Sequence, residues 1–152
     1  MGVYTSAITK HIAVASNTTK TLLQLHNDNV GTAKIVEWGI SFDGISSTAT
    51  PARVKLIRQT TGGTMTQRGA GVKYDSSRTD SNASYRVKAT AEPTLTADIY
   101  ELHQVTPTGG LLVKQYPLGR EITLNAGERL GLVVTAGPNS AASALGYIVW
   151  EE

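Results

Sequence analysis

Cysteine is absent from the 152 residues of this chain, its charge is nearly balanced, and it has no long apolar run. The absence of cysteine excludes disulfide frameworks, thiolate metal sites and cysteine nucleophiles. No apolar stretch approaches the roughly 18 residues that a membrane-spanning helix needs. The opening residues, Met-Gly-Val-Tyr-Thr-Ser, have neither the charged start nor the apolar core of a signal peptide. We therefore expect no membrane partner.

The charge pattern argues against a nucleic-acid partner. Fourteen basic residues against twelve acidic ones give a net charge of +2, whereas nucleic-acid-binding domains normally carry a basic stripe. The nearest candidate is Arg53, Lys55 and Arg58, and three apolar residues interrupt it. We interpret it as the polar side of a strand rather than as a phosphate-binding patch.

The segment Lys34–Asp43 carries the clearest structural signal. Val36, Trp38, Ile40 and Phe42 alternate with more polar neighbours, and side chains of a strand alternate between its two faces. Similar runs recur along the chain between turns rich in Gly, Pro, Asn and Asp. They predict roughly ten short strands in one all-β domain, an antiparallel β-sandwich of jelly-roll-like type. The expected interior is Val36, Trp38, Ile40, Phe42, Val54, Leu56, Leu130, Leu132, Val134, Tyr147 and Val149.

Two segments are expected outside the regular sandwich. Residues 1–9 precede the first clear strand and are predicted to form an N-terminal arm, so that the sandwich proper spans residues 10–152. Residues 60–82 contain Gly62-Gly63 and the polar tract Asp75–Asp80, which predict a long flexible loop. Long loops often carry function. Glu151 and Glu152 are interpreted as a solubilising terminus.

Residue patterns for catalysis or metal binding are missing. His11, His26 and His103 lie apart in the sequence, without the spacing of common metal sites. No serine lies in a G-x-S-x-G turn, and the glycine pair at Gly69 and Gly71 lacks the third glycine of a dinucleotide-binding loop. We therefore expect no enzyme activity, no catalytic residues, no metal and no cofactor.

Two stretches resemble a protein family. One runs from Lys34 to Thr64 and includes Lys-Ile-Val-Glu-Trp-Gly-Ile-Ser-Phe-Asp-Gly; the other runs from Tyr-Pro-Leu-Gly-Arg-Glu-Ile to the ending Gly-Tyr-Ile-Val-Trp-Glu-Glu. They are similar to small β-rich structural proteins of tailed bacteriophages, including cyanophages, several of which are capsid decoration (cement) proteins. The resemblance implies a homotrimer that binds the major capsid protein lattice. It also implies synthesis in the host cytoplasm and a final location on the capsid surface of the virion.

Partner contacts are predicted from flexibility and from the last strand, which is apolar on both faces. The predicted interface residues are Gly2, Val3, Tyr4, Ile8, Met65, Arg68, Tyr74, Ile148 and Trp150. The alternative function is a trimeric tail-fibre or receptor-binding tip that recognises host surface glycan. That alternative would be favoured by exposed tyrosines in the loop or near Tyr100 and Tyr116. A secreted trimeric ligand lacks its export signal, and a hydrolase ranks last.

Overall fold

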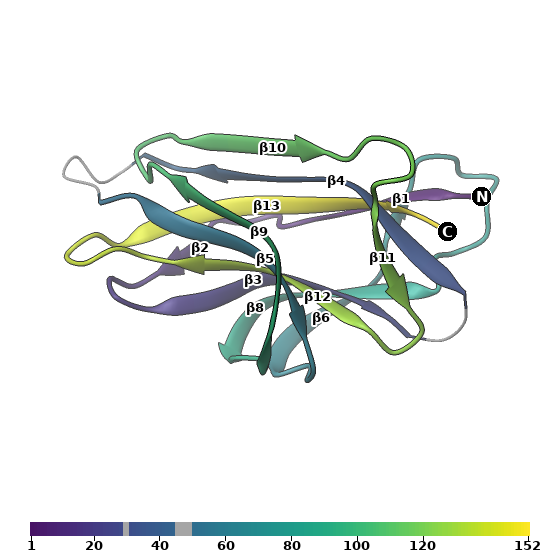
Figure 1. Cartoon of the computed structure of the whole chain (residues 1–152), viewed down its shortest axis with the longest axis horizontal. Helices are drawn as coiled ribbons and strands as arrows, with labels where there is room; N and C mark the ends of the chain where they lie inside the picture. Colours follow the sequence, from purple (N-terminus) through teal and green to yellow (C-terminus); the bar gives the residue numbers. More distant parts are fainter. Residues whose placement is uncertain (29–30, 45–49) are drawn as a thin grey trace.

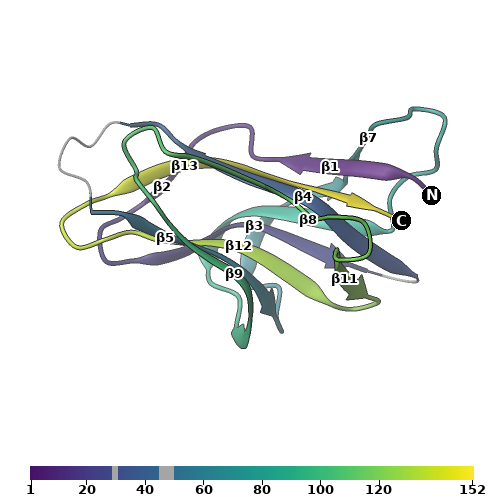
Figure 2. The ribbon, with the colours of Figure 1, turned by 45° about the horizontal axis from the view of Figure 1, so that its top comes forward.

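The computed structural model describes residues 1–28, 31–44 and 50–152, and in these residues the chain forms thirteen strands and no helix. The strands make two antiparallel sheets that face each other, as Figures 1 and 2 show. The predicted all-β sandwich is therefore confirmed. None of the described segments is a helix that could cross a membrane.

Sheet A has seven strands and sheet B has six. Sheet A contains β1 (Val3–Ala7), β2 (Ile12–Val14), β4 (Thr32–Phe42), β7 (Val72–Lys73), β10 (Leu111–Gln115), β11 (Ile122–Asn125) and β13 (Ala142–Glu151). Sheet B contains β3 (Thr19–Asn27), β5 (Ala52–Gln59), β6 (Thr64–Ala70), β8 (Ala83–Ala91), β9 (Leu95–Val105) and β12 (Arg129–Thr135).

The pairing of eight of these strands is that of a jelly roll. In chain order they are β1, β3, β4, β5, β9, β10, β12 and β13, and the first pairs with the last, β1 with β13. The second pairs with the seventh, the third with the sixth and the fourth with the fifth, as β3·β12, β4·β10 and β5·β9. Such wrapping of an antiparallel hairpin produces the two-sheet jelly roll. The paired strands β8 and β6 extend sheet B beyond β3, and β7 extends sheet A beyond β1.

The core lies between the sheets and is built from the alternating apolar residues. Trp38, Ile40 and Phe42 of β4 point into it, as predicted, and face the inward residues of sheet B. The largest fully buried side chains are Trp38, Trp150, Leu22, Leu23, Leu25, Ile35, Ile40, Leu56, Leu124, Leu130, Leu132 and Ile148. Each fully buried Leu or Ile contributes roughly 1.5–3 kcal/mol of transfer free energy.

The predicted N-terminal arm is wrong, because residues 3–7 form β1. Val3 pairs with Glu151 and Ala7 pairs with Tyr147, so both chain ends are built into sheet A. The ring of Tyr4 stacks on Trp150 with the ring centroids 6.0 Å apart. The pairing partner lies about 140 residues away in the sequence, and periodicity does not identify so distant a partner.

The predicted flexible loop at residues 60–82 includes two strands. It contains β6, which pairs with β8, and β7, which pairs with β1. Gly71 lies between these two strands, directly against Trp150: a Cβ there would be 2.3 Å from the indole Cη2. The glycines that suggested flexibility therefore include one required by close packing.

Glu152 has a structural role, contrary to the prediction of a solubilising end. Its carboxylate accepts hydrogen bonds from the backbone N–H groups of Asn82 (2.8 Å) and Ala83 (3.0 Å). It also accepts from the hydroxyl of Ser81 (2.7 Å) and from Nε1 of Trp150 (3.0 Å). One carboxylate thus ties residues 81–83, at the start of β8 in sheet B, to the end of sheet A.

Candidate functional site

The outer face of sheet A, which points away from the core, carries an unusual number of apolar side chains. Because strand residues alternate, burial of Trp38, Ile148 and Trp150 on the inner face places their neighbours outside. We define the apolar outer face as the outward residues Val3, Val72, Leu111, Val113, Leu145, Tyr147 and Val149 together with Tyr74, which directly follows β7.

The strand register arranges this face in cross-strand rows from β10 to β7. One cross-strand row runs from Val113 through Gly39 and Tyr147 to Ala7. A parallel row on one side begins with Leu111, and a row on the other side ends at Val72. Directly opposed side chains in a sheet are neighbours. Leu111, Leu145 and Tyr147 line one hollow, whereas polar residues, including Glu37 and Thr5, lie between the apolar residues of the other rows.

Exposure distinguishes this surface from an ordinary sheet face. Leu111 is 70% exposed, Val113 47%, Val72 63% and Tyr74 66%. Leu145 and Tyr147 are half-buried among them, and an apolar hollow of about 240 Å³ lies beside Ala7, Leu145 and Tyr147. Contiguous exposed apolar surface on a folded domain marks an interaction site more often than chance exposure does.

Tyr147 and Glu37 fix the centre of the face. The Tyr147 ring lies over Gly39, where an added Cβ would be 2.4 Å from the ring atom Cε1. Its hydroxyl donates a hydrogen bond to Oε1 of Glu37, and Nε2 of Gln115 donates to Oε2 at 2.6 Å. Burial, followed by the hydrogen bond and charge of Glu37, raises the pKa of the Tyr147 phenol to about 12. The phenol therefore stays neutral to a higher pH than an ordinary tyrosine does.

A second group of polar residues closes the open side of the sandwich between β9 and β10. Nε1 of Trp38 donates to the hydroxyl of Tyr116 (3.2 Å), which donates to Oε1 of Glu101 (3.3 Å). Nε2 of His103 lies 2.9 Å from Oε2 of the same carboxylate, and Nζ of Lys114 lies 3.9 Å from Oε1. Burial raises the pKa of Tyr116 well above its usual range. These contacts connect the edge strands of the two sheets.

Each of the three histidines lies beside one carboxylate. His11 is near Asp43, His26 near Asp28 and His103 near Glu101. Among residues 1–28, 31–44 and 50–152, no group of three or more His, Asp or Glu side chains could hold a metal ion.

Of the nine predicted interface residues, four lie outside the core and five are buried. Val3 and Tyr74 belong to the apolar outer face, and Met65 and Arg68 lie on β6 at the edge of sheet B. The remaining five are buried: Gly2, Tyr4, Ile8, Ile148 and Trp150.

Ile148 and Trp150 correct the prediction for the last strand. Both are fully buried in the core, so neither is available to a partner of the folded chain. Tyr147 and Val149, which were expected inside, lie on the other face of β13, where Tyr147 is half-buried and Val149 is buried as predicted. A strand that is apolar on both faces gives no periodic signal for choosing between them.

Sequence reasoning missed Leu111 and Val113, the most exposed apolar pair of the face on one strand. They belong to Leu-Leu-Val-Lys-Gln, in which alternation places Leu111 and Val113 together on one side. That signal identifies a shared face but does not say that it is the outer one. The distinction comes from the pairing of Leu112 and Lys114 with the inward residues Ile40 and Trp38.

The fold and this surface define the class of the molecule: a jelly-roll β-sandwich with one exposed apolar sheet face. Comparison with known proteins adds no relative. No family model matches the chain, and no curated protein or solved structure matches it either.

Proposed function

We propose that the chain is a non-catalytic structural subunit that associates with copies of itself and decorates a bacteriophage capsid by binding the major capsid protein lattice. The observation that supports self-association is the apolar outer face of sheet A, with Leu111 at 70% and Val72 at 63% exposure. The capsid role and the number of three subunits rest on the sequence resemblance.

The physical argument for an oligomer concerns the free energy of exposed apolar area. Burying that area is favourable by roughly 25 cal/mol per Å², and a second copy of the chain is the partner always present during synthesis. Glu37 is already engaged by Tyr147 and Gln115, so covering the centre of the face does not leave that carboxylate without hydrogen bonds.

An oligomer also suits a decorating role. When one subunit of a trimer touches the lattice, the others bind at a high effective concentration, and avidity can rise by roughly 10²–10⁴. Weak individual contacts then clamp neighbouring capsid subunits together. Sheet B and the loops at either end of the sandwich remain for the lattice if sheet A is covered by self-association.

The experiment is to mix purified protein with undecorated capsids and to follow co-sedimentation and images of the particles. Saturable binding at three-fold or quasi-three-fold positions supports the proposal. Binding to cell-wall glycan, with no binding to capsids, would overturn it.

The second candidate is the receptor-binding tip module that recognises host surface glycan. The observation that favours it is the exposure of Tyr74 (66%) and Tyr100 (38%), because flat aromatic faces stack on sugar rings. Tyr100 is held in place: its hydroxyl accepts a hydrogen bond from Nε of Arg58 at 2.8 Å, and the guanidinium lies 5.7 Å from the ring centroid. The capsid and glycan arms of the same experiment separate the two candidates.

A further inference from the structure

A polar row crosses the outer face of sheet B at one end of the sandwich, on the layer opposite the apolar outer face. Thr19 of β3 pairs with Thr135 of β12, Thr135 pairs with Arg53 of β5, and Arg53 pairs with Gln104 of β9. Directly paired residues point to the same side of a sheet. Four adjacent strands therefore present two hydroxyls, a guanidinium and an amide side by side.

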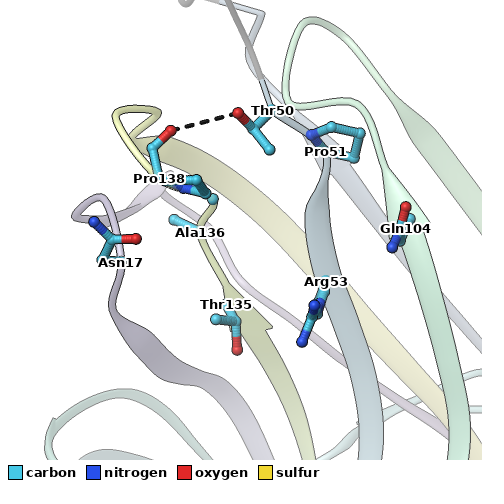
Figure 3. A pocket seen from close by; sticks show the side chains of 9 residues that line it. Asn17, Thr50, Pro51, Arg53, Gln104, Thr135, Ala136 and Pro138 are labelled. Atoms are coloured by element: carbon cyan, nitrogen blue, oxygen red, sulfur yellow. Dashed lines mark hydrogen bonds between the residues drawn. The ribbon is translucent and has the colours of Figure 1, made fainter.

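The end of this row opens into a cleft of about 290 Å³, shown in Figure 3. Arg53, Gln104 and Thr135 line it together with Asn17, and the segment Ala136–Pro138 forms a wall. The Thr50 hydroxyl lies 3.4 Å from the Pro138 carbonyl oxygen, to which it donates, so that two of the surrounding segments are joined.

Two cations of this face, Arg53 and Lys55, have no ion-pair partner among the residues that the structure describes. Arg58 pairs with Glu128 and Arg78 with Asp75, but neither Arg53 nor Lys55 has a carboxylate within ion-pair distance among the described residues. Positions 29–30 and 45–49 contain no Asp or Glu in the sequence. Lys55 is two residues from Arg53 on the same strand and so shares its face.

The neutral polar groups of the cleft are also free to bind. In the described part of the chain, the side-chain amides of Gln104 and Asn17 make no hydrogen bond, and both residues are exposed. Among the residues 1–28, 31–44 and 50–152, the hydroxyl of Thr135 bonds to that of Thr19 alone, at 2.8 Å. Pro51 and Pro138 add apolar ring faces to the rim. The cleft therefore offers one guanidinium, several uncharged donors and acceptors, and a small apolar wall.

We propose that this cleft binds a carboxylate-bearing sugar residue, such as a hexuronic or sialic acid of a glycan. A guanidinium presents paired N–H donors that match a carboxylate. The amides and hydroxyls around Arg53 suit the sugar hydroxyl groups, which both donate and accept hydrogen bonds. Arg53 is the one cation among the residues that line the cleft, and a single guanidinium fits one negative charge and a neutral ring better than a doubly charged phosphate.

This site is additional to the proposed structural role and independent of it. The cleft lies on sheet B, and the apolar outer face lies on sheet A. A subunit whose sheet A is covered by other copies still presents the cleft, so the protein could hold an acidic glycan while assembled.

The test uses the full chain and D-glucuronate as the probe, with D-glucose, acetate and inorganic phosphate as comparison ligands. Binding is followed by chemical-shift changes of the Arg53 Nε–H and of the Gln104 and Asn17 side-chain NH₂ groups. We expect saturable shifts with D-glucuronate, and weaker binding by tenfold or more for each of the three comparison ligands.

Two variants and one control make the result specific to the cleft. Arg53→Gln removes the guanidinium, and Gln104→Glu places a carboxylate directly opposite Arg53, where it competes with the ligand. Each is expected to weaken D-glucuronate binding at least tenfold. Arg68→Gln is the matched control, because Arg68 is exposed on β6, away from the cleft.

Each possible outcome either supports or overturns the proposed site. Binding that is lost in Arg53→Gln and kept in Arg68→Gln supports the site. No shift at the cleft, unchanged affinity in Arg53→Gln, or equally tight binding of acetate or phosphate would overturn the assignment of an acidic sugar. Because all variants change exposed side chains, thermal unfolding midpoints close to that of the wild type confirm that folding is not the cause.

Discussion

The contact between Gly39 and Tyr147 gives the sharpest quantitative prediction for sheet A. Gly39→Ala is expected to lower the free energy of unfolding by about 1–3 kcal/mol, the usual range for overpacking a filled site. The added Cβ would lie 2.4 Å from Cε1 and 2.8 Å from Cζ of the Tyr147 ring. Gly39 is not among the described glycines with positive φ, so alanine suits the backbone, and the ring is what has to move.

Moving the ring has a defined consequence. It separates the Tyr147 hydroxyl from Glu37, whose carboxylate accepts its hydrogen bond, and a hydrogen bond to a charged group contributes up to about 1.5–3 kcal/mol. In a Tyr147→Ala background there is no ring to displace. Gly39→Ala should then be neutral or stabilising by about 0.5–1 kcal/mol, because glycine is unfavourable inside a strand.

The assay is a double-mutant cycle of four proteins, each unfolded in urea at one protein concentration and followed by tryptophan fluorescence. We expect a coupling energy of about 2 kcal/mol between the two positions. Tyr147→Phe is the control, since it keeps the ring and removes only the hydroxyl. Equal losses on Gly39→Ala with and without the ring would refute the reasoning.

Two further predictions concern single residues. Glu152→Gln should lower stability by about 1–3 kcal/mol, because the amide NH₂ replaces one carboxylate oxygen and leaves one of the backbone N–H groups of Asn82 and Ala83 without its acceptor. Hydrogen exchange of at least one of these two amides should accelerate, whereas Glu151→Gln should leave both unchanged. For Tyr147, the folded pKa of about 12 lies above the ordinary value of 10.0, so the stability that it contributes is complete below about pH 10 and is lost as the pH rises through 12. Tyrosinate absorbance together with unfolding at each pH checks this sign, and a difference between wild type and Tyr147→Phe that stays flat from pH 9 to pH 12 would contradict it.

The fold class was predictable because alternation within a strand is a local property. Val54, Leu56, Leu130, Leu132 and Val134 were all expected inside, and all are fully buried. Each of these residues has a polar or small residue on at least one side along its strand. Period 2 was therefore enough to assign their side.

Val36 shows where local alternation fails. It continues the pattern of Trp38 and Ile40, yet it is only half-buried. In the pairing with β13, Val149 faces Glu37 and Trp150 faces Ile35, so Val36 is an extra residue on β4. This bulge transfers the inward position to Ile35, and nothing in the adjacent residues predicts it.

The candidate site was less predictable than the fold, because its position depends on pairing between distant segments. β1 joins β13, and β10 joins β4, only after the jelly roll has closed. Gly146 did carry a usable signal: it shares the face of Ile148 and Trp150, and a Cβ there would lie 2.6 Å from Cδ2 of Leu132 in the opposite sheet. A glycine required by such close approach marks the inner face of β13.

The most direct measurement is the solution mass of the wild type, of Leu111→Lys and of Leu118→Lys by sedimentation equilibrium over a range of concentrations. Leu111 is 70% exposed on the apolar outer face, and Leu118 is 93% exposed in the turn between β10 and β11. Leu118→Lys is therefore the control: it makes the same substitution at an exposed leucine outside the apolar outer face. We expect the wild type and Leu118→Lys to form the same oligomer and Leu111→Lys to associate at least tenfold more weakly. A wild type that stays monomeric throughout, or a Leu111→Lys protein that associates as strongly as the wild type, would contradict the assignment of this face to self-association.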